Sequence, residues 1–434
     1  MKTVKLLSIA ALAFVGALTA GCNSDDNIID QPQQPQNTDN TVTLTTTVSM
    51  DGDNATTRAL TSTGVKTFAE GETMAIYYWK NKGDVHEKAV SAPLTAGDIT
   101  NGGKSATFTF TLDNPYKDMS VVYTYPAAMA NADFTPNYDA LYNNQDGTLA
   151  TLGSNFDFCT RSGAWNGDNL PSLTLENQLA ILAITLKDEA GTSEITGNTT
   201  KLTVSDGTNT YNVNRSAAEG PIYVAIRPTS DATIDITATS GGKGYYKTLA
   251  TKTYEAGNGY PVSWRMIKVY TLAESTVGMI VGTDGKAYAA ADKDNLPSGV
   301  TAAGMVAYKN GSNGLVIALA DEANTMNWST ATGASGAAAH TPVVTGGTWK
   351  LPSKAEWNQM FGADAEEDIA NYMSLNYALA AAGGTALPES YSYYWSSTEF
   401  EGDIAYVELD CGSAYWYNNG DEDEDRLVRA CLAF

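Results

Sequence analysis

The feature that most constrains the fold is a period of two in hydrophobicity, repeated in short runs from about residue 41 to residue 270. In residues 105–112, alanine, two phenylalanines and leucine alternate with serine and threonine, and glycine, asparagine or aspartate separates such runs. A period of two places the apolar side chains on one face of a half-buried β-strand. Many short strands at this spacing predict two tandem antiparallel β-sandwiches.

Residues 41–50 form the first of these predicted strands. Val42, Leu44, Val48 and Met50 share one face, and we place the threonines on the other. This pattern is typical of a strand with one face on the core.

The division between the two sandwiches follows from the later runs. Residues 179–186 are apolar on both faces, which predicts a buried central strand. Asp206 and Gly207 separate two short runs, which predicts a β-hairpin. We therefore predict an N-terminal sandwich over residues 41–170 and a second sandwich over residues 171–270.

The remaining residues, 271–434, have a different composition that includes helical signals. Ser353 and Glu356 have the spacing of a capping box, which predicts a helix that begins there. Residues 365–382 read as a second helix, with acids in the first turn and Gly383 after its end. Short strand patterns surround these segments, so we predict an α+β domain.

The N-terminus predicts export and a lipid anchor. Two lysines precede an apolar run over residues 6–20, and the sequence LTAGC ends at Cys22. This is a signal peptide over residues 1–21, too short for a stable membrane span, with a bacterial lipobox at its cleavage point. We expect Cys22 to carry acyl chains, such as palmitate, that hold the protein at the outer membrane. Residues 22–40 are polar and read as a flexible tether.

Charge and motif content exclude several functions. The net charge is −23, and loss of the two lysines of the leader makes it −25, so nucleic acid is not an expected partner. The two histidines, His86 and His340, lie far apart, and no GxSxG, P-loop, GxGxxG or HExxH motif occurs. We therefore predict that the protein is not an enzyme.

The cysteines allow one disulfide. Apart from the lipobox residue, the chain has Cys159, Cys411 and Cys431. The compartment is oxidising, which permits a bridge. Cys411 and Cys431 lie on two predicted strands that flank one loop and are the candidate pair. Cys159 then has no predicted disulfide partner.

Three segments of the part predicted to form the two sandwiches carry a family resemblance. The segment TRALTSTGVKTFAEGETMAIYYW, with Phe68, Gly71 and Glu72 at its motif positions, is followed by LENQLAILAITL and AGNGYPVSW. In this order the motifs resemble the fimbrillin, or Mfa-like, family of Bacteroidetes, over about residues 41–268. The resemblance implies that the two sandwiches are transthyretin-like.

The last part of the chain resembles another group. The segments TWKLPSKAEW, YYWSSTE and RLVRACLAF are similar to the C-terminal domain of Fibrobacter paralogous repeats, over about residues 278–434. That resemblance implies a C-type-lectin-like α+β domain, in which Trp349, Trp357 and Trp395 belong to the core. The expected fold is therefore mainly β, with two sandwiches and a lectin-like domain.

The fimbrillin resemblance also implies a mechanism of assembly. In that family, an arginine-specific protease removes the lipidated leader together with the first strand, and a strand from another pilus subunit fills the groove. Residues 41–50 would be the removable strand, with cleavage between Arg58 and Ala59. The alternative is that Arg58 is an ordinary loop arginine and the first strand stays.

The ligand-binding expectation concerns the last part of the chain. The apparent last strand leaves no spare donor segment, so we expect a pilus tip adhesin that contacts a glycan or protein on a cell surface. The candidate ligand residues are Tyr415, Trp416, Tyr417, Asp421, Asp423 and Asp425. The tyrosines and tryptophan would stack on a sugar, and the acids would hold Ca²⁺. The alternative is that Trp416 is core and the acidic loop is only solvated. The Glu-Pro-Asn and Trp-Asn-Asp motifs of calcium-dependent sugar-binding lectins are absent.

Three other functions remain open at this point. One is a non-polymerising glycan-binding lipoprotein that keeps its first strand and its lipid. Another is an anchor subunit of the pilus, held in the outer membrane by its lipid. The third is an enzyme similar to the formylglycine-generating enzymes, which have a lectin-like fold and need a reactive cysteine pair.

Overall fold

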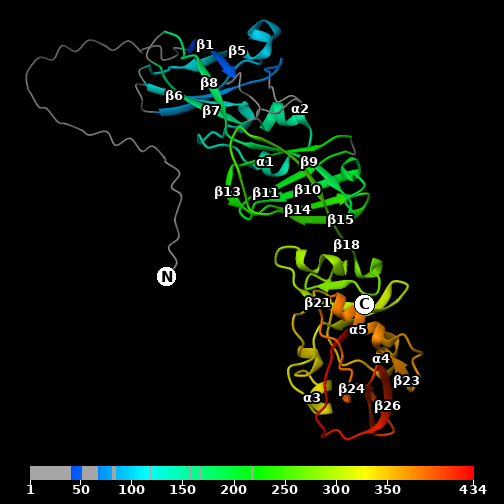
Figure 1. Ribbon diagram of the computed structural model, residues 1–434. Helices are drawn as coiled ribbons and strands as arrows, with labels where there is room; N and C mark the ends of the chain where they lie inside the picture. The colour runs from blue at the N-terminus through cyan, green and yellow to red at the C-terminus, as the bar shows by residue number, and fades with distance from the viewer. Residues whose placement is uncertain are drawn as a thin grey trace, which may run out of the picture. The chain divides into compact units, whose positions relative to one another are not determined.

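The computed structural model describes residues 41–50, 67–80, 85–117, 119–156, 158–165, 168–216 and 219–434. The fold is mainly β, as predicted, and its described strands form six sheets. Figure 1 shows the order of the elements along the chain. Among the described residues, no helix combines the length and the apolar character that a membrane span requires.

The first domain is one eight-stranded sheet with the order β3-β2-β6-β7-β8-β1-β5-β4. Its strands are β1 (Thr41–Met50), β2 (Ala75–Lys80), β3 (Val85–Val90), β4 (Ile99–Thr100), β5 (Ser105–Asp113), β6 (Met119–Tyr125), β7 (Cys159–Trp165) and β8 (Leu173–Asn177). The sheet folds over itself, because Phe108 and Phe110 of β5 meet Tyr125 and Tyr123 of β6 with ring centroids 6.2 and 6.4 Å apart. The two halves thus enclose one core in the manner of a sandwich.

The second domain has a five-stranded sheet, β11-β10-β14-β15-β18, and a three-stranded sheet, β12-β9-β17, with the pair β13-β16 beside them. Its strands are β9 (Ala180–Lys187), β10 (Thr199–Ser205), β11 (Thr210–Asn214), β12 (Ile222–Ile226), β13 (Thr229–Ala232), β14 (Asp235–Ser240), β15 (Lys243–Thr248), β16 (Lys252–Tyr254), β17 (Gly259–Arg265) and β18 (Ile267–Val269). The predicted buried central strand is confirmed, since β9 lies between β12 and β17. The predicted hairpin is confirmed too, with Gly207 at a φ of 83° between β10 and β11.

The boundary between these domains differs from the predicted residue 170. Strand β8, which we assigned to the second sandwich, pairs with β7 and β1 and belongs to the first sheet. Conversely, the segment with helices α1 (Asp139–Asn143) and α2 (Leu149–Thr151) precedes β7 yet packs into the second core through Leu141 and Leu152. Two strand pairs, β1 with β8 and β9 with β17, are parallel, so the sandwiches are not purely antiparallel as predicted.

The third domain is α+β, as predicted. It has a five-stranded sheet, β20-β19-β21-β22-β27, and a four-stranded sheet, β23-β26-β25-β24. Its elements are β19 (Ile280–Gly282), β20 (Ala287–Tyr288), β21 (Ala302–Asn310), β22 (Asn313–Ala318), α3 (Trp328–Thr332), α4 (Lys354–Phe361), β23 (Ile369–Asn371), α5 (Met373–Ala381), β24 (Ser392–Phe400), β25 (Asp403–Asp410), β26 (Ser413–Gly420) and β27 (Cys431–Ala433).

Of the two helices predicted in this domain, one begins where we predicted and the other begins later. The capping box of Ser353 and Glu356 is present at the start of α4. The helix predicted over residues 365–382 begins only at Met373, because residues 369–371 pair with β26 as an edge strand. Its predicted stop is confirmed, with Gly383 at a φ of 83°.

The core of the third domain contains the aromatic residues that the motifs predicted. Trp349, Trp357 and Trp395 are at most 3% exposed. The Arg429 side chain is buried in this domain, and each of its side-chain nitrogens donates a hydrogen bond. Its Nε donates to an Asp321 oxygen over 2.5 Å, and its terminal nitrogens donate to the carbonyl oxygens of Ala318 and Thr385. The guanidinium therefore joins three separate segments of the domain.

Candidate functional site

The first strand lies inside the first sheet rather than at its edge. β1 runs antiparallel to β5, from the pair Thr41 and Asp113 to the pair Ser49 and Ser105. On its other side it runs parallel to β8 from Val48 to Met50. Figure 1 shows β1 beside β5 and β8. Removing β1 would therefore leave two unpaired strand edges that face one slot.

The inward face of β1 is formed by alternate residues. Leu44 and Val48 are 8% and 0% exposed and belong to the core of the domain, as predicted. Val42 is half-buried and packs against the same core. Our placement of all the threonines on the outer face is wrong for Thr46, which is 2% exposed. A period of two requires this, because Thr46 has the same parity as Leu44 and Val48.

The hydroxyl of Thr46 lies beside two polar groups of the first domain. Its Oγ1 donates a hydrogen bond to the Pro171 carbonyl oxygen over 2.8 Å. The Tyr123 hydroxyl is buried beside it and makes no hydrogen bond of ordinary geometry in the described part of the chain. Burial raises the pKa of Tyr123, and the Thr46 hydroxyl partly offsets this rise. The inner face of β1 is thus apolar with one polar position at its centre.

The predicted processing and lipidation residues lie outside the described residues. Arg58 and Ala59 fall within residues 51–66, the stretch that joins β1 to the next described residue, Thr67. Cys22 falls within residues 1–40. In sequence, residues 51–66 are the sole covalent connection between β1 and the domain that it completes.

The predicted aromatic ligand residues separate onto two faces of the four-stranded sheet. Tyr415 and Tyr417 of β26 face outward, and Tyr417 is 40% exposed. Trp416 between them is 8% exposed and belongs to the core, so its predicted role in ligand binding is wrong. Its Nε1 donates to Oδ1 of the buried Asn358 over 2.7 Å. The alternation of β26 makes this separation unavoidable.

Two further tyrosines, missed in the sequence, join the outward face. Tyr406 of β25 pairs across strands with Tyr417, and their rings stack with centroids 5.3 Å and planes 17° apart. Tyr393 of β24 meets Tyr406 edge-on at 5.9 Å. We call Tyr393, Tyr406, Tyr415 and Tyr417 the tyrosine face. Tyr393 and Tyr406 alternate with the buried Tyr394 and Val407 along their strands, and this alternation is the sequence signal that could have placed them on the outward face.

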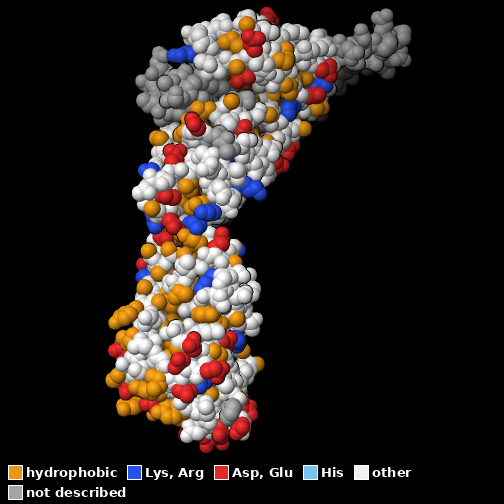
Figure 2. Space-filling model, turned by 90° about the vertical axis from the view of Figure 1, so that its right-hand side faces the viewer, with side chains coloured by type: hydrophobic (Ala, Val, Ile, Leu, Met, Phe, Trp, Pro, Cys, Tyr) orange, Lys and Arg blue, Asp and Glu red, His pale blue; other side chains and the backbone are white. Residues whose placement is uncertain are grey.

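Charged groups surround the tyrosine face. The guanidinium carbon of Arg426 lies 3.7 Å from the centroid of the Tyr406 ring, and the same guanidinium donates to Glu424. The charge of Glu408 raises the pKa of Tyr417, to which Glu408 is also hydrogen-bonded. Figure 2 colours tyrosine orange with the hydrophobic residues, and it shows orange and red acidic side chains close together on the C-terminal domain. Aromatic rings bordered by carboxylates and hydroxyls can both stack and accept hydrogen bonds.

The acidic loop does not form the predicted calcium site. Within the described ranges, no group of three or more His, Cys, Asp or Glu side chains is arranged to hold a metal ion. Asp421 instead accepts a hydrogen bond from the backbone of Asp423, which shapes the turn, and Asp425 is exposed. The loop is therefore a solvated acidic turn beside the tyrosine face.

The predicted disulfide between Cys411 and Cys431 is also wrong. Both thiols are free, with Cys411 exposed and Cys431 buried. Cys411 occupies the tight turn between β25 and β26 at a φ of 48°, whereas Cys431 lies inside β27 in the core. A hydrogen bond and the charge of Asp410 raise the pKa of Cys411. The two residues were assigned to neighbouring strands because the sequence did not show that β27 joins the other sheet.

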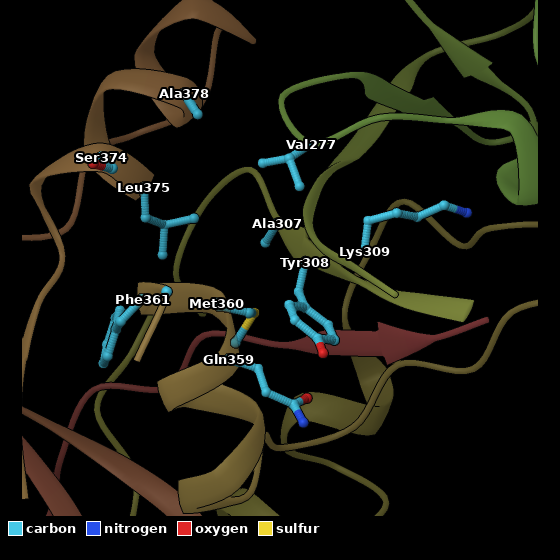
Figure 3. A pocket seen from close by; sticks show the side chains of 11 residues that line it. Val277, Ala307, Tyr308, Lys309, Gln359, Met360, Phe361, Ser374, Leu375 and Ala378 are labelled. Carbon is cyan, nitrogen blue, oxygen red and sulfur yellow. The ribbon is translucent and has the colours of Figure 1, made fainter. Parts of the chain in front are cut away.

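A separate apolar pocket lies between β21, α4 and α5 (Figure 3), with a cavity volume of about 250 Å³. Met360, Leu375 and Ala307 line it. The Lys309 ammonium at its rim donates to the carbonyl oxygens of Leu272 and Ala273. The lining contains no carboxylate, histidine or cysteine.

Comparison with known proteins gives distant likenesses. No model of a protein family matches the sequence, and no curated protein matches it. Among solved structures, the chain is similar to a fimbrial protein from Bacteroides ovatus ATCC 8483, with 14% identity over 92% of this chain and 100% of that chain, at a TM-score of 0.26. It is also similar to a fimbrial assembly protein from Parabacteroides distasonis ATCC 8503, with 12% identity over 53% of this chain and 94% of that chain, at a TM-score of 0.30. Identities and scores this low assign neither a family nor a function.

Proposed function

We propose that this protein is a cell-surface fimbrial subunit that loses β1 by cleavage after Arg58 and accepts a strand from a neighbouring subunit in its place. The observation that carries the proposal is the position of β1 between β5 and β8. Because β1 is a central strand, its loss leaves a slot of defined length rather than a trimmed edge. Its chain connection, residues 51–66, contains the arginine that a protease would need.

Physical chemistry favours refilling of such a slot. An empty slot exposes the backbone groups of β5 and β8 and the apolar floor that Leu44 and Val48 cover. Such groups bind an incoming strand by β-augmentation, in which main-chain hydrogen bonds give affinity and side-chain pockets give specificity. Each Leu-sized side chain that is buried contributes about 1.5–3 kcal/mol before ordering costs. This is enough to hold subunits together.

We place the protein at the tip of the fibre, as an adhesin. Residues 431–433 pair with β22, and the Phe434 backbone exchanges two hydrogen bonds with Gly314. These residues are therefore committed to their own domain and are not available as a donor strand. Before cleavage, Cys22 would hold the precursor at the outer membrane through its lipid.

Replacement of Arg58 in the native bacterium tests this proposal. We expect Arg58→Ala chains to keep their lipid and to be missing from isolated surface fibres. Lys66→Ala, which alters a basic residue of the same connecting stretch, should enter fibres normally. Equal incorporation of Arg58→Ala would overturn the processing step.

The tyrosine face favours glycan binding, either at a fibre tip or by an uncleaved lipoprotein. Tyrosine rings stack on the apolar faces of sugars, their hydroxyls donate and accept hydrogen bonds, and the Glu408 carboxylate accepts them. Screening the mature protein on a glycan array identifies the ligand. Tyr417→Ala should weaken binding about tenfold, corresponding to about 1.4 kcal/mol. Tyr377→Ala, at an exposed tyrosine on α5, should not. Equal loss in both variants would argue against this face.

A further inference from the structure

We infer that the slot of β1 selects a donor strand that carries a serine or threonine at the position of Thr46, flanked two residues away on each side by apolar side chains. This inference rests on the proposed strand exchange and names the chemistry of the partner segment. It comes from the contacts of β1 itself, since a guest strand must satisfy the groups that β1 satisfies.

The two flanking positions are apolar and differ in size. Leu44 lies opposite Phe110 on β5, and Val48 lies opposite Ala106. All four side chains are buried in one core. A charged or strongly polar donor residue at either position would lose its water without gaining a partner, which is unfavourable.

The central position has the opposite requirement. The Pro171 carbonyl oxygen, which accepts the bond from Thr46, lies just before β8, the strand that runs beside β1. The Tyr123 hydroxyl is buried beside the same threonine and has no alternative partner in the described part of the chain. A donor strand with an apolar residue here would leave the part-buried Pro171 carbonyl oxygen without its hydrogen bond and would remove the only polar side chain of β1 beside the Tyr123 hydroxyl. Leaving a buried polar group without its partner costs more than an ordinary hydrogen bond contributes.

Shape alone cannot make this distinction, because valine and threonine have nearly the same volume. They differ in the hydroxyl group, so a valine would fill the slot but would not bond to Pro171. The outward positions set no such requirement, since Thr45 and Thr47 are exposed. The slot therefore predicts the donor pattern apolar-x-hydroxyl-x-apolar, with x unrestricted.

The test uses the uncleaved chain, with β1 still present, and with a recognition sequence for a specific protease inserted within residues 51–66. After cleavage, β1 is held without a covalent link, and fluorescent peptides with the sequence of residues 41–50 can compete for the slot. The peptides are wild type, Thr46→Ser, Thr46→Val and, as a matched control, Thr45→Val. Equilibrium exchange is measured by fluorescence anisotropy.

We expect wild-type, Thr46→Ser and Thr45→Val peptides to exchange with similar affinity, within about threefold. Thr46→Val should bind at least tenfold more weakly. Equal or tighter binding of Thr46→Val would overturn the inferred preference while leaving strand exchange intact. If no peptide entered, wild type included, the exchange itself would be refuted, and the preference with it. In the uncleaved chain, Thr46→Val should also speed amide hydrogen exchange in β1 relative to Thr46→Ser, which checks the preference independently of peptide entry.

Discussion

Truncation of one inward side chain of β1 should loosen this strand selectively. Leu44→Ala removes three carbon atoms from a side chain that is 8% exposed. At about 0.8 kcal/mol for each buried CH₂ the transfer loss is about 2.4 kcal/mol. The cavity left behind brings the cost to about 2–5 kcal/mol. Since each 1.4 kcal/mol is tenfold, the opening equilibrium of β1 should rise roughly 30-fold to a few thousand-fold.

Amide hydrogen exchange measured by mass spectrometry resolves this effect along the chain. Peptides from β1 and from residues 105–113 of β5 should exchange faster, because their amides pair with one another. The β14–β15 hairpin of the second domain should be unchanged. Thr45→Ala is the matched control, since its side chain is exposed and should alter stability by no more than about 0.5 kcal/mol. Unchanged exchange in β1 and β5 of Leu44→Ala would refute the central position assigned to this strand.

Three other variants and reactions test the third domain. Asp321→Ala removes the ion-pair partner of the fully buried Arg429 guanidinium. It should destabilise the domain by about 3–5 kcal/mol, measured by urea unfolding followed by tryptophan fluorescence. Trp416→Phe leaves the buried Asn358 oxygen without its donor and should cost about 1–3 kcal/mol, where a ligand-binding tryptophan on the surface would cost nothing. Cys411 should alkylate at pH 8 more slowly than an ordinary exposed thiol, because its adjacent carboxylate raises its pKa, and the buried Cys431 should react only after unfolding. Rapid, equal labelling of both thiols in the native protein would contradict their assigned positions.

Local patterns in the sequence predicted the elements well. The alternation of β5, the buried run of β9, the Asp206-Gly207 hairpin and the capping box of α4 all depend on neighbouring residues. Each is set by contacts or turns within a few positions, so the sequence contains the information directly.

Long-range pairing was where prediction failed. Residues 369–371 joined β26 as a strand although their local pattern is helical, and β8 joined the first sheet although it follows the predicted boundary. The disulfide prediction failed for the same reason, because β27 pairs with β22 and not with β26. Pairing between distant segments is decided by the tertiary core, which local periodicity does not show.

The candidate sites show the same division. Tyr415 and Tyr417 were found from their local sequence, whereas Tyr393 and Tyr406 joined them through cross-strand register. Thr46 was misplaced although its parity was available in the sequence, because a polar residue was not expected among buried apolar ones.

The most direct test of the account is the N-terminal residue of the protein in fibres isolated from the cell surface. Mass spectrometry should find chains that begin at Ala59, with the peptide of residues 41–50 absent and a strand of another polypeptide in its place. Fibre-bound chains that begin at the lipidated Cys22 and still contain residues 41–50 would contradict the exchange of β1.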